Sequence, residues 1–245
     1  MNKFLWMLSL VVGSYLTAQS RTDYYQGGHY GAHKPWLYIS KITTQKKGDT
    51  LEFERLVYRD SNELNTGNVL ATDRVTILMF NENSIRILSD SLSFNWPNGP
   101  KCHKLWKNDS LVIEYQDPKR INFDFKVGDI RKLKPDALTF SSIAALELYL
   151  SQCDLFEGFE KDFLMADDTL RPFRVRVLGT IYFHPEKENS SKCFDISINP
   201  LDRKSLHAGK IFMEVASRAV LKREFVTNET KHKSILHEYR ISLDL

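Results

Sequence analysis

From Pro35 onwards, apolar and polar side chains alternate along the chain. Four apolar residues alternate with polar ones over Ile121–Val127, and the stretches Phe173–Phe183 and Ile235–Leu243 repeat the pattern. A period of two is typical of a β-strand that buries one face. Short polar turns such as Lys47–Asp49 separate these stretches. The pattern therefore predicts strands joined by tight turns in an antiparallel sheet.

One stretch departs from this alternation and predicts a helix over residues 142–152. Ile143 and Leu146 begin an apolar stripe at helical spacing, so one side of the helix should face a core. A hydroxyl of Thr139 or Ser141 can cap the amino end. The predicted fold class is mainly β: a large twisted antiparallel sheet, able to roll toward a half-barrel, with this helix packed on its concave or open side.

The first residues, 1–18, form a segment of another kind. Lys3 supplies a positive charge, residues 4–12 are apolar apart from Ser9, and the following stretch ends in the small residue Ala18 at a plausible cleavage point. This order is typical of a secretory signal peptide cleaved after Ala18 or Ser20. The rival interpretation is a membrane anchor, but the apolar run is shorter than the roughly 20 residues that cross a bilayer. We therefore expect an exported protein, located in the periplasm or cell envelope or secreted.

The chain after this segment is expected to have two parts. Residues 19–34 are polar, rich in glycine and tyrosine, and without a period, which predicts a flexible lead-in. Residues 35–245 are expected to form a single β-rich domain. No stretch in them approaches the length of a transmembrane helix, so the mature chain should not span a membrane.

Composition narrows the classes of partner. Of 245 residues, 42% are hydrophobic and 27% charged, and the formal net charge is +3. So small a surplus predicts no nucleic-acid partner. Cys102, Cys153 and Cys193 have no CxxC spacing, which argues against a redox motif or a zinc site. Buried thiols are the favoured interpretation, with one disulfide and one spare thiol as the alternative.

An acidic group follows the predicted helix. Its members are Glu157, Glu160, Asp162, Asp167 and Asp168. Two carboxyl groups held about 5–10 Å apart could hydrolyse a glycosidic bond, which makes a hydrolase one alternative function. The turn-rich sequence around them favours a solvated loop instead. No histidine, serine or cysteine has a spacing that predicts a catalytic site, and none predicts a metal or cofactor site.

Aromatic residues on alternating strand positions are a further signal. There are 15 phenylalanines, and those on predicted strand faces include Phe123, Phe125, Phe173, Phe183, Phe212 and Phe225. One helix covers only part of a large sheet, so uncovered rings could line a groove for a lipid-like molecule. The plainer interpretation is that the rings fill an ordinary core.

The stretch from Pro135 to Val226 resembles a family of bacterial exported proteins, the domain of unknown function 3108. The likeness lies in the order and spacing of five segments: Leu138–Leu150, Arg174–Ile181, Cys193–Pro200, Gly209–Ser217 and Leu221–Phe225. The resemblance implies an exported, β-rich fold. It implies no activity and no site residues.

These observations together favour a non-catalytic protein that binds an apolar or amphiphilic small molecule in a groove lined by the sheet. One alternative is a structural or interaction module whose exposed strand edge pairs with an envelope protein. The other is a hydrolase that uses the acids within residues 157–168. The sequence assigns no ligand-binding residues to any of the three.

Overall fold

The computed structural model describes residues 19–30, 36–81, 84–95, 101–107, 110–116, 123–127, 138–166, 170–186, 189–202, 207–229 and 232–242. These residues form one sheet of fifteen strands and two helices. The strands are β1 (Gln19–Tyr30), β2 (Trp36–Lys47), β3 (Thr50–Tyr58), β4 (Ala71–Asn81), β5 (Ser84–Asn95), β6 (Lys101–Lys107), β7 (Ser110–Gln116), β8 (Phe123–Val127), β9 (Thr139–Phe140), β10 (Glu160–Ala166), β11 (Leu170–Glu186), β12 (Asn189–Pro200), β13 (His207–Glu214), β14 (Val220–Glu229) and β15 (His232–Ile241). The helices are α1 (Ser61–Thr66) and α3 (Ile143–Leu150).

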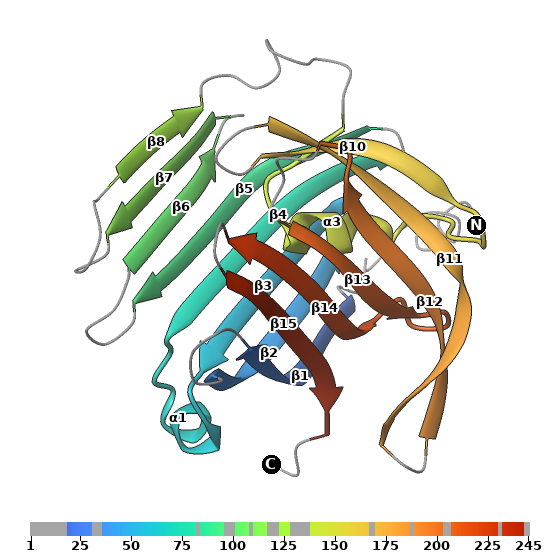
Figure 1. The fold of residues 1–245 in the computed structure, drawn as a ribbon, viewed down its shortest axis with the longest axis horizontal. Coiled ribbons are helices and arrows are strands. Elements are labelled where there is room, and N and C mark those ends of the chain that lie inside the picture. Colours follow the sequence, from blue (N-terminus) through green and yellow to red (C-terminus); the bar gives the residue numbers. More distant parts are fainter. Residues whose placement is uncertain are drawn as a thin grey trace, which may run out of the picture.

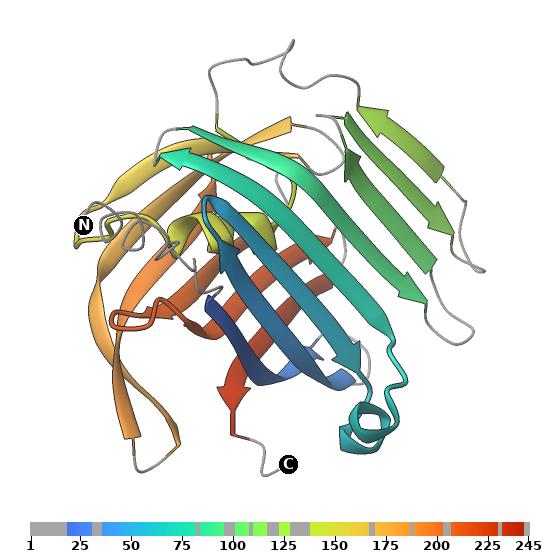
Figure 2. The ribbon, with the colours of Figure 1, turned by 180° about the vertical axis from the view of Figure 1, so that it is seen from behind.

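The sheet curls into a nearly closed barrel (Figures 1 and 2). Its strand order is β8-β7-β6-β5-β4-β3-β2-β1-β15-β14-β13-β12-β11-β10-β9, and the short β9 pairs in parallel with β10. The twelve strands from β5 round to β9 form the barrel wall, while β6, β7 and β8 continue beyond β5 as a separate leaf (Figure 1). The predicted fold class is confirmed, and the sheet closes further than a half-barrel.

A buried polar contact spans the seam between the two ends of this wall. Ser141, which follows β9, donates a hydrogen bond through its hydroxyl to the carboxylate of Asp90 on β5. Neither residue has any exposed surface. A charged-group hydrogen bond in such a place is stronger than one in water, so it can hold the two ends of the wall together.

Helix α3 lies inside the barrel, as Figures 1 and 2 show. Every residue from Ala144 to Leu150 is buried, including Glu147, because sheet surrounds the helix. The helix predicted over residues 142–152 is thus confirmed with slightly tighter bounds. The cap is Ser142, whose hydroxyl accepts a hydrogen bond from the Ala145 N–H at 3.2 Å, and not Thr139 or Ser141. The expected single apolar stripe is wrong, since the core lies on all sides of α3.

The flexible lead-in expected over residues 19–34 is wrong for Gln19–Tyr30, which form β1. This strand pairs with both β2 and β15, so it belongs to the middle of the wall. The alternation was hidden because β1 points polar residues and glycines inward. A Cβ at Gly27 would lie 2.1 Å from the Tyr38 ring, so the glycine is needed for close packing. The predicted signal peptide, residues 1–18, and residues 31–34 lie outside the described ranges.

Strand β11 contains a bulge that changes which face its apolar residues occupy. The register with β12 shifts between Val177 and Gly179. Before the shift, Phe173 and Val177 point into the main core; after it, Phe183 packs on a second cluster with Phe212. One extra residue reverses the facing of a strand. The alternation over Phe173–Phe183 therefore spans two faces, not one.

Two of the three cysteines can be placed. Cys153 and Cys193 are buried free thiols, in agreement with the favoured interpretation that they pack as small hydrophobic side chains, while the side chain of Cys102 lies outside the described part. Burial raises the pKa of the Cys193 thiol to about 11, which keeps it protonated at neutral pH. Within the described ranges, neither helix has the length and apolarity needed to cross a bilayer.

Candidate functional site

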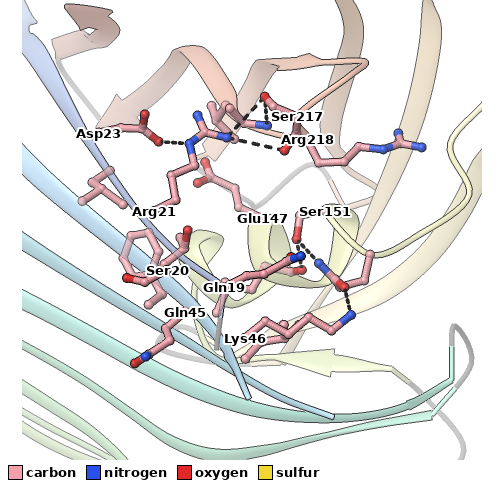
Figure 3. A pocket seen from close by; sticks show the side chains of 18 of the residues that line it. Gln19, Ser20, Arg21, Asp23, Gln45, Lys46, Glu147, Ser151, Ser217 and Arg218 are labelled. Carbon is pink, nitrogen blue, oxygen red and sulfur yellow. Dashed lines mark hydrogen bonds and ion pairs between the residues drawn. The ribbon is translucent and has the colours of Figure 1, made fainter. Parts of the chain in front are cut away.

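A pocket of about 250 Å³ opens at one end of the barrel (Figure 3). Its walls come from the start of β1, the end of β2, the start of β3, the carboxyl end of α3 and the turn between β13 and β14. The apolar residues lining it are Ile42, Leu51, Phe53, Leu148, Ala219 and Val220. The polar ones are Gln19, Ser20, Arg21, Asp23, Tyr25, Thr44, Gln45, Lys46, Glu147, Ser151, Gln152, Ser217, Arg218 and Arg223.

Strand β1 supplies more of the polar wall than any other element, because alternate residues of a strand share one face. Gln19, Arg21, Asp23 and Tyr25 all line the pocket. Their burial rises along the strand, from exposed Gln19 at the rim to Tyr25, which is 2% exposed, at the base. The pocket thus runs from solvent into the barrel interior.

The base of the pocket is an ion pair between the helix and the wall. Arg223 of β14 donates two hydrogen bonds to the carboxylate of Glu147 on α3, from Nε and Nη2, each at 2.7 Å. Both residues are 5% exposed. Such a bidentate contact fixes the planes of both groups as well as their distance. Because Glu147 is the acidic residue of α3, this pair sets how the helix sits in the barrel.

The network continues from Arg223 to Glu238 on β15, the neighbouring strand of the wall. Arg223 donates from Nη1 to Glu238 at 3.0 Å, and Arg55 of β3 donates to the same carboxylate at 2.7 Å. The hydroxyl of Ser40 adds a third donor at 2.6 Å. Burial acts to raise the pKa of Glu238, but Arg55 and Arg223 outweigh it, so the pKa lies below its ordinary value. Two cations and two carboxylates thereby balance inside the barrel.

Tyr25 closes the space above Arg223. The Arg223 guanidinium lies over its ring, 4.7 Å from the centroid, and its hydroxyl donates to the Val220 carbonyl at 2.6 Å. Burial is the main cause that raises the pKa of Tyr25, so its hydroxyl stays protonated. The Tyr25 hydroxyl therefore remains a donor to Val220, and its ring forms part of the pocket wall.

The rim carries a second set of charges, centred on Arg21. Its Nε lies 2.6 Å from Asp23, and its Nη1 lies 3.3 Å from the Ser217 hydroxyl oxygen and 3.4 Å from the Ser217 carbonyl (Figure 3). Asp23 is shared with Arg240, whose Nε is 3.0 Å away. On another side of the rim, Lys46 donates to the amide oxygen of Gln152 at 2.7 Å.

Arg218 adds a further cation in a strained backbone conformation. Its φ is +58°, in the left-handed region that favours glycine. The turn is held by the Arg218 N–H, which donates to the Glu214 carbonyl at 2.9 Å, and by the Ser217 hydroxyl, which donates to the Glu214 carboxylate. This last bond is the main cause of the lowered pKa of Glu214. The rim turn is thus rigid.

The acids proposed from sequence lie elsewhere. Glu160 and Asp162 of β10 face solvent, each paired with Arg174 of β11, and Glu157 is exposed. Asp167 and Asp168 fall outside the described ranges. Glu157, Glu160 and Asp162, the acids that the structure describes, do not line the pocket, so they do not meet in this cleft. Nor do the described residues contain a group of three or more potential metal ligands.

The strand-face phenylalanines mostly fill cores. Phe173 and Phe225 lie in the main core, and Phe183 and Phe212 pack in the second cluster. The side chains of Phe123 and Phe125 lie outside the described part. Helix α3 occupies the space where an apolar groove was expected. Sequence reasoning missed Arg21, Glu147 and Arg223; the available signal was the single carboxylate in an otherwise apolar helix.

Comparisons with known proteins assign neither a family nor a function to the chain. No family model matches the chain, and no curated protein matches it. Among solved structures, a β-barrel-like protein of domain of unknown function DUF1849 from Brucella abortus is similar in outline. It has 8% sequence identity and a TM-score of 0.36, with 94% of this chain and 99% of that chain covered. The resemblance to the domain of unknown function 3108 stays a prediction.

Proposed function

We propose that this is an exported, non-catalytic binding protein that holds a small amphiphile in the pocket at the barrel mouth. The observation that carries the proposal is the two-sided lining. One side is apolar, with Leu51, Phe53 and Leu148, and the other is polar and charged, with Arg21 and Lys46 at the rim. A site with an apolar surface and a few placed polar groups is typical of small-molecule binding.

The volume limits the size of the ligand. A buried apolar cavity of about 150 Å³ is enough to bind benzene. A pocket of about 250 Å³ therefore has room for a ring or a short chain with a head group, but not for a long acyl chain. The lipid-like ligand expected from the sequence is narrowed to a short amphiphile, because α3 fills the rest of the barrel.

The polar groups at the base support binding without catalysis. Both carboxylate oxygens of Glu147 accept hydrogen bonds from Arg223, which leaves this acid poorly placed to act as a general base. Tyr25 keeps its proton at neutral pH. Glu147, Arg223 and Tyr25 are therefore suited to form a rigid polar base for the pocket.

Native mass spectrometry of the protein purified from its own envelope fraction tests this function. The chain offers a matched pair of variants on β2: Thr44 lines the pocket, whereas Thr43 bonds to Thr22 on the outer face. We expect an amphiphile to be released on denaturation from the wild type and from Thr43→Trp, but not from Thr44→Trp. Equal ligand content in the two variants, or no bound ligand and no binding of added short amphiphiles, would contradict the proposal.

The same sample tests export. Removal of a signal peptide after Ala18 or Ser20 predicts an intact mass that begins at Gln19 or Arg21. A full-length mass in the envelope fraction would contradict this processing. The result bears on location only, since the pocket variants report on binding independently.

The interaction-module alternative rests on the leaf formed by β6, β7 and β8. In the described part of the chain, β8 has one strand neighbour, so its other edge is open to pairing. A protein adduct in the native spectrum, unaffected by Thr44→Trp, would favour this alternative over the pocket.

A further inference from the structure

We infer that the ligand's head group is an anion that binds to the Arg21 guanidinium at a rim also lined by Lys46 and Arg218. This inference rests on the proposed function and names the chemical class of its ligand. The head group would lie at the rim and the apolar part would point toward Leu51 and Phe53.

The first support is an unsatisfied donor. Arg21 uses Nε on Asp23 and Nη1 on Ser217, but its Nη2 is buried and has no hydrogen-bond partner. A buried donor without a partner costs more free energy than a satisfied one gains. Because Nη2 has almost no accessible surface, a ligand oxygen reaches it only after the Arg21 side chain, which is 29% exposed, turns toward the pocket. An anionic oxygen would then satisfy this donor most strongly.

The second support is the charge balance of the lining. Four of the lining residues are cations and two are carboxylates. Arg223 and Glu147 satisfy each other at the base, and Asp23 is shared between Arg21 and Arg240. The rim is therefore left with a positive surplus. Such a surplus in a partly enclosed site attracts anions and repels cations.

Lys46 and Arg218 also line the pocket, and in Figure 3 the Arg218 side chain extends away from Arg21 and Lys46. Lys46 bonds to the neutral amide of Gln152, and no ion pair joins it to a carboxylate of the described residues. Arg218 lies over the Phe194 ring at 5.0 Å, and its buried Nη1 has no hydrogen-bond partner. Neither cation is thus neutralised by a neighbouring acid within the described ranges.

The strained backbone of Arg218 is consistent with a role for its charge. Glycine would adopt a φ of +58° without steric cost, whereas arginine does so against a local penalty. Residues in such conformations cluster at ligand-binding sites. The rigid turn also fixes the Ser217 groups that hold Arg21 in place.

Calorimetric titration with three molecules of equal chain length tests the inference. Hexanoate, hexan-1-ol and hexylamine carry an anionic, a neutral and a cationic head group. We expect hexanoate to bind tightest. Arg21→Gln should weaken hexanoate by roughly tenfold, as expected when a charge-assisted hydrogen bond is lost, and should weaken hexan-1-ol much less. Arg174→Gln on the outer wall removes the same charge far from the pocket and should change neither.

The outcomes separate this inference from the proposed function. If hexan-1-ol or hexylamine binds as tightly as hexanoate and Thr44→Trp abolishes that binding, the pocket function stands and the anionic head group is overturned. If inorganic phosphate binds as well as hexanoate, the anion subsite stands and the amphiphile proposal fails. If none of the molecules binds in the millimolar range, both are overturned.

Discussion

The barrel carries two sets of arginine–carboxylate contacts that are alike in geometry and different in burial. Inside, Arg223 holds Glu147 at 2.7 Å, with both residues 5% exposed. Outside, on β10 and β11, Arg174 holds Asp162 at 2.7 Å, with side chains 38% and 51% exposed. Equal distances therefore describe two different situations, because water surrounds one pair and protein the other.

Burial decides what each set can do. Exposed pairs gain little because solvent screens them and side-chain entropy opposes them. A buried pair costs desolvation, so it gives little net stability, but removal of one partner strands the other charge. The inner set thus fixes one position of α3 in the barrel, and with it the base of the pocket. The outer contacts add little to the position of β10 and β11, because backbone hydrogen bonds already pair these strands.

Replacing Glu147 should have the largest effect. Glu147→Ala leaves Arg223 with one carboxylate partner and opens a void between α3 and β14. We expect the free energy of unfolding to fall by about 3–5 kcal/mol. Urea denaturation followed by circular dichroism measures this. A loss below about 1 kcal/mol would show that the inner pair behaves like an exposed one.

The double variant Glu147→Leu with Arg223→Met sharpens the same comparison. It removes both charges and keeps similar volume, so most of the stability lost in Glu147→Ala should return. Glu238 would keep Arg55 and Ser40 as partners. A double variant no more stable than Glu147→Ala would mean that the helix position, and not the stranded charge, causes the loss.

The next largest effect should be a loss of stability at acid pH, caused by protonation of the inner carboxylate Glu238. The folded pKa of Glu238 is lowered, because Arg55 and Arg223 outweigh burial. Its contribution to stability is therefore complete above the ordinary glutamate pKa of 4.5 and is lost as the pH falls through the folded value. Urea midpoints measured from neutral pH downward should fall in that range for the wild type. The slope should be shallower in Glu238→Gln; equal slopes would contradict the assignment.

What the sequence could predict follows the hydrophobic period. The helix over residues 142–152 and the first half of β11, with Phe173, Val175 and Val177, bury apolar residues at regular spacing, and both were predicted. Strand β15 was predicted as a strand but with the wrong buried face, because it buries Glu238 and leaves Tyr239 38% exposed. Strand β1 was not, because its inward face carries Arg21 and Asp23 in place of hydrophobic residues. Alternate residues of β1 do face the interior, but most of them are polar, so the hydrophobic pattern does not reveal the strand.

The candidate site was beyond prediction for a related reason. Glu147 and Arg223 are 76 residues apart, and Arg55 and Glu238 are 183 apart, so no local spacing links them. The acids that did cluster in sequence, Glu157 to Asp168, are close along the chain and face solvent where described. Long-range register brings functional groups together in a barrel, and register is set by pairing that single stretches do not reveal.

Replacing Arg218 should change stability for a different reason, since its backbone conformation is involved as well as its side chain. Arg218→Gly relieves the left-handed backbone and loses the contact with Phe194, two effects of about 1 kcal/mol that oppose each other. Stability should therefore stay within about 1 kcal/mol of the wild type. Arg218→Ala keeps the strain and loses the contact, so it should be the less stable of the two. The reverse order in urea denaturation would contradict a backbone cost at this turn.

The outer set should show the smallest effect. Arg176→Gln removes the contact with Glu160, whose side chain stays 34% exposed and still pairs with Arg174. We expect the urea midpoint to move by little more than its experimental error at low salt, and by nothing at 1 M salt, where the screening length falls to roughly 3 Å. Glu147→Ala measured at both salt concentrations is the matched control, since salt reaches a buried pair poorly. If the outer variant were as costly as the inner one, or equally insensitive to salt, burial would not be what separates the two sets.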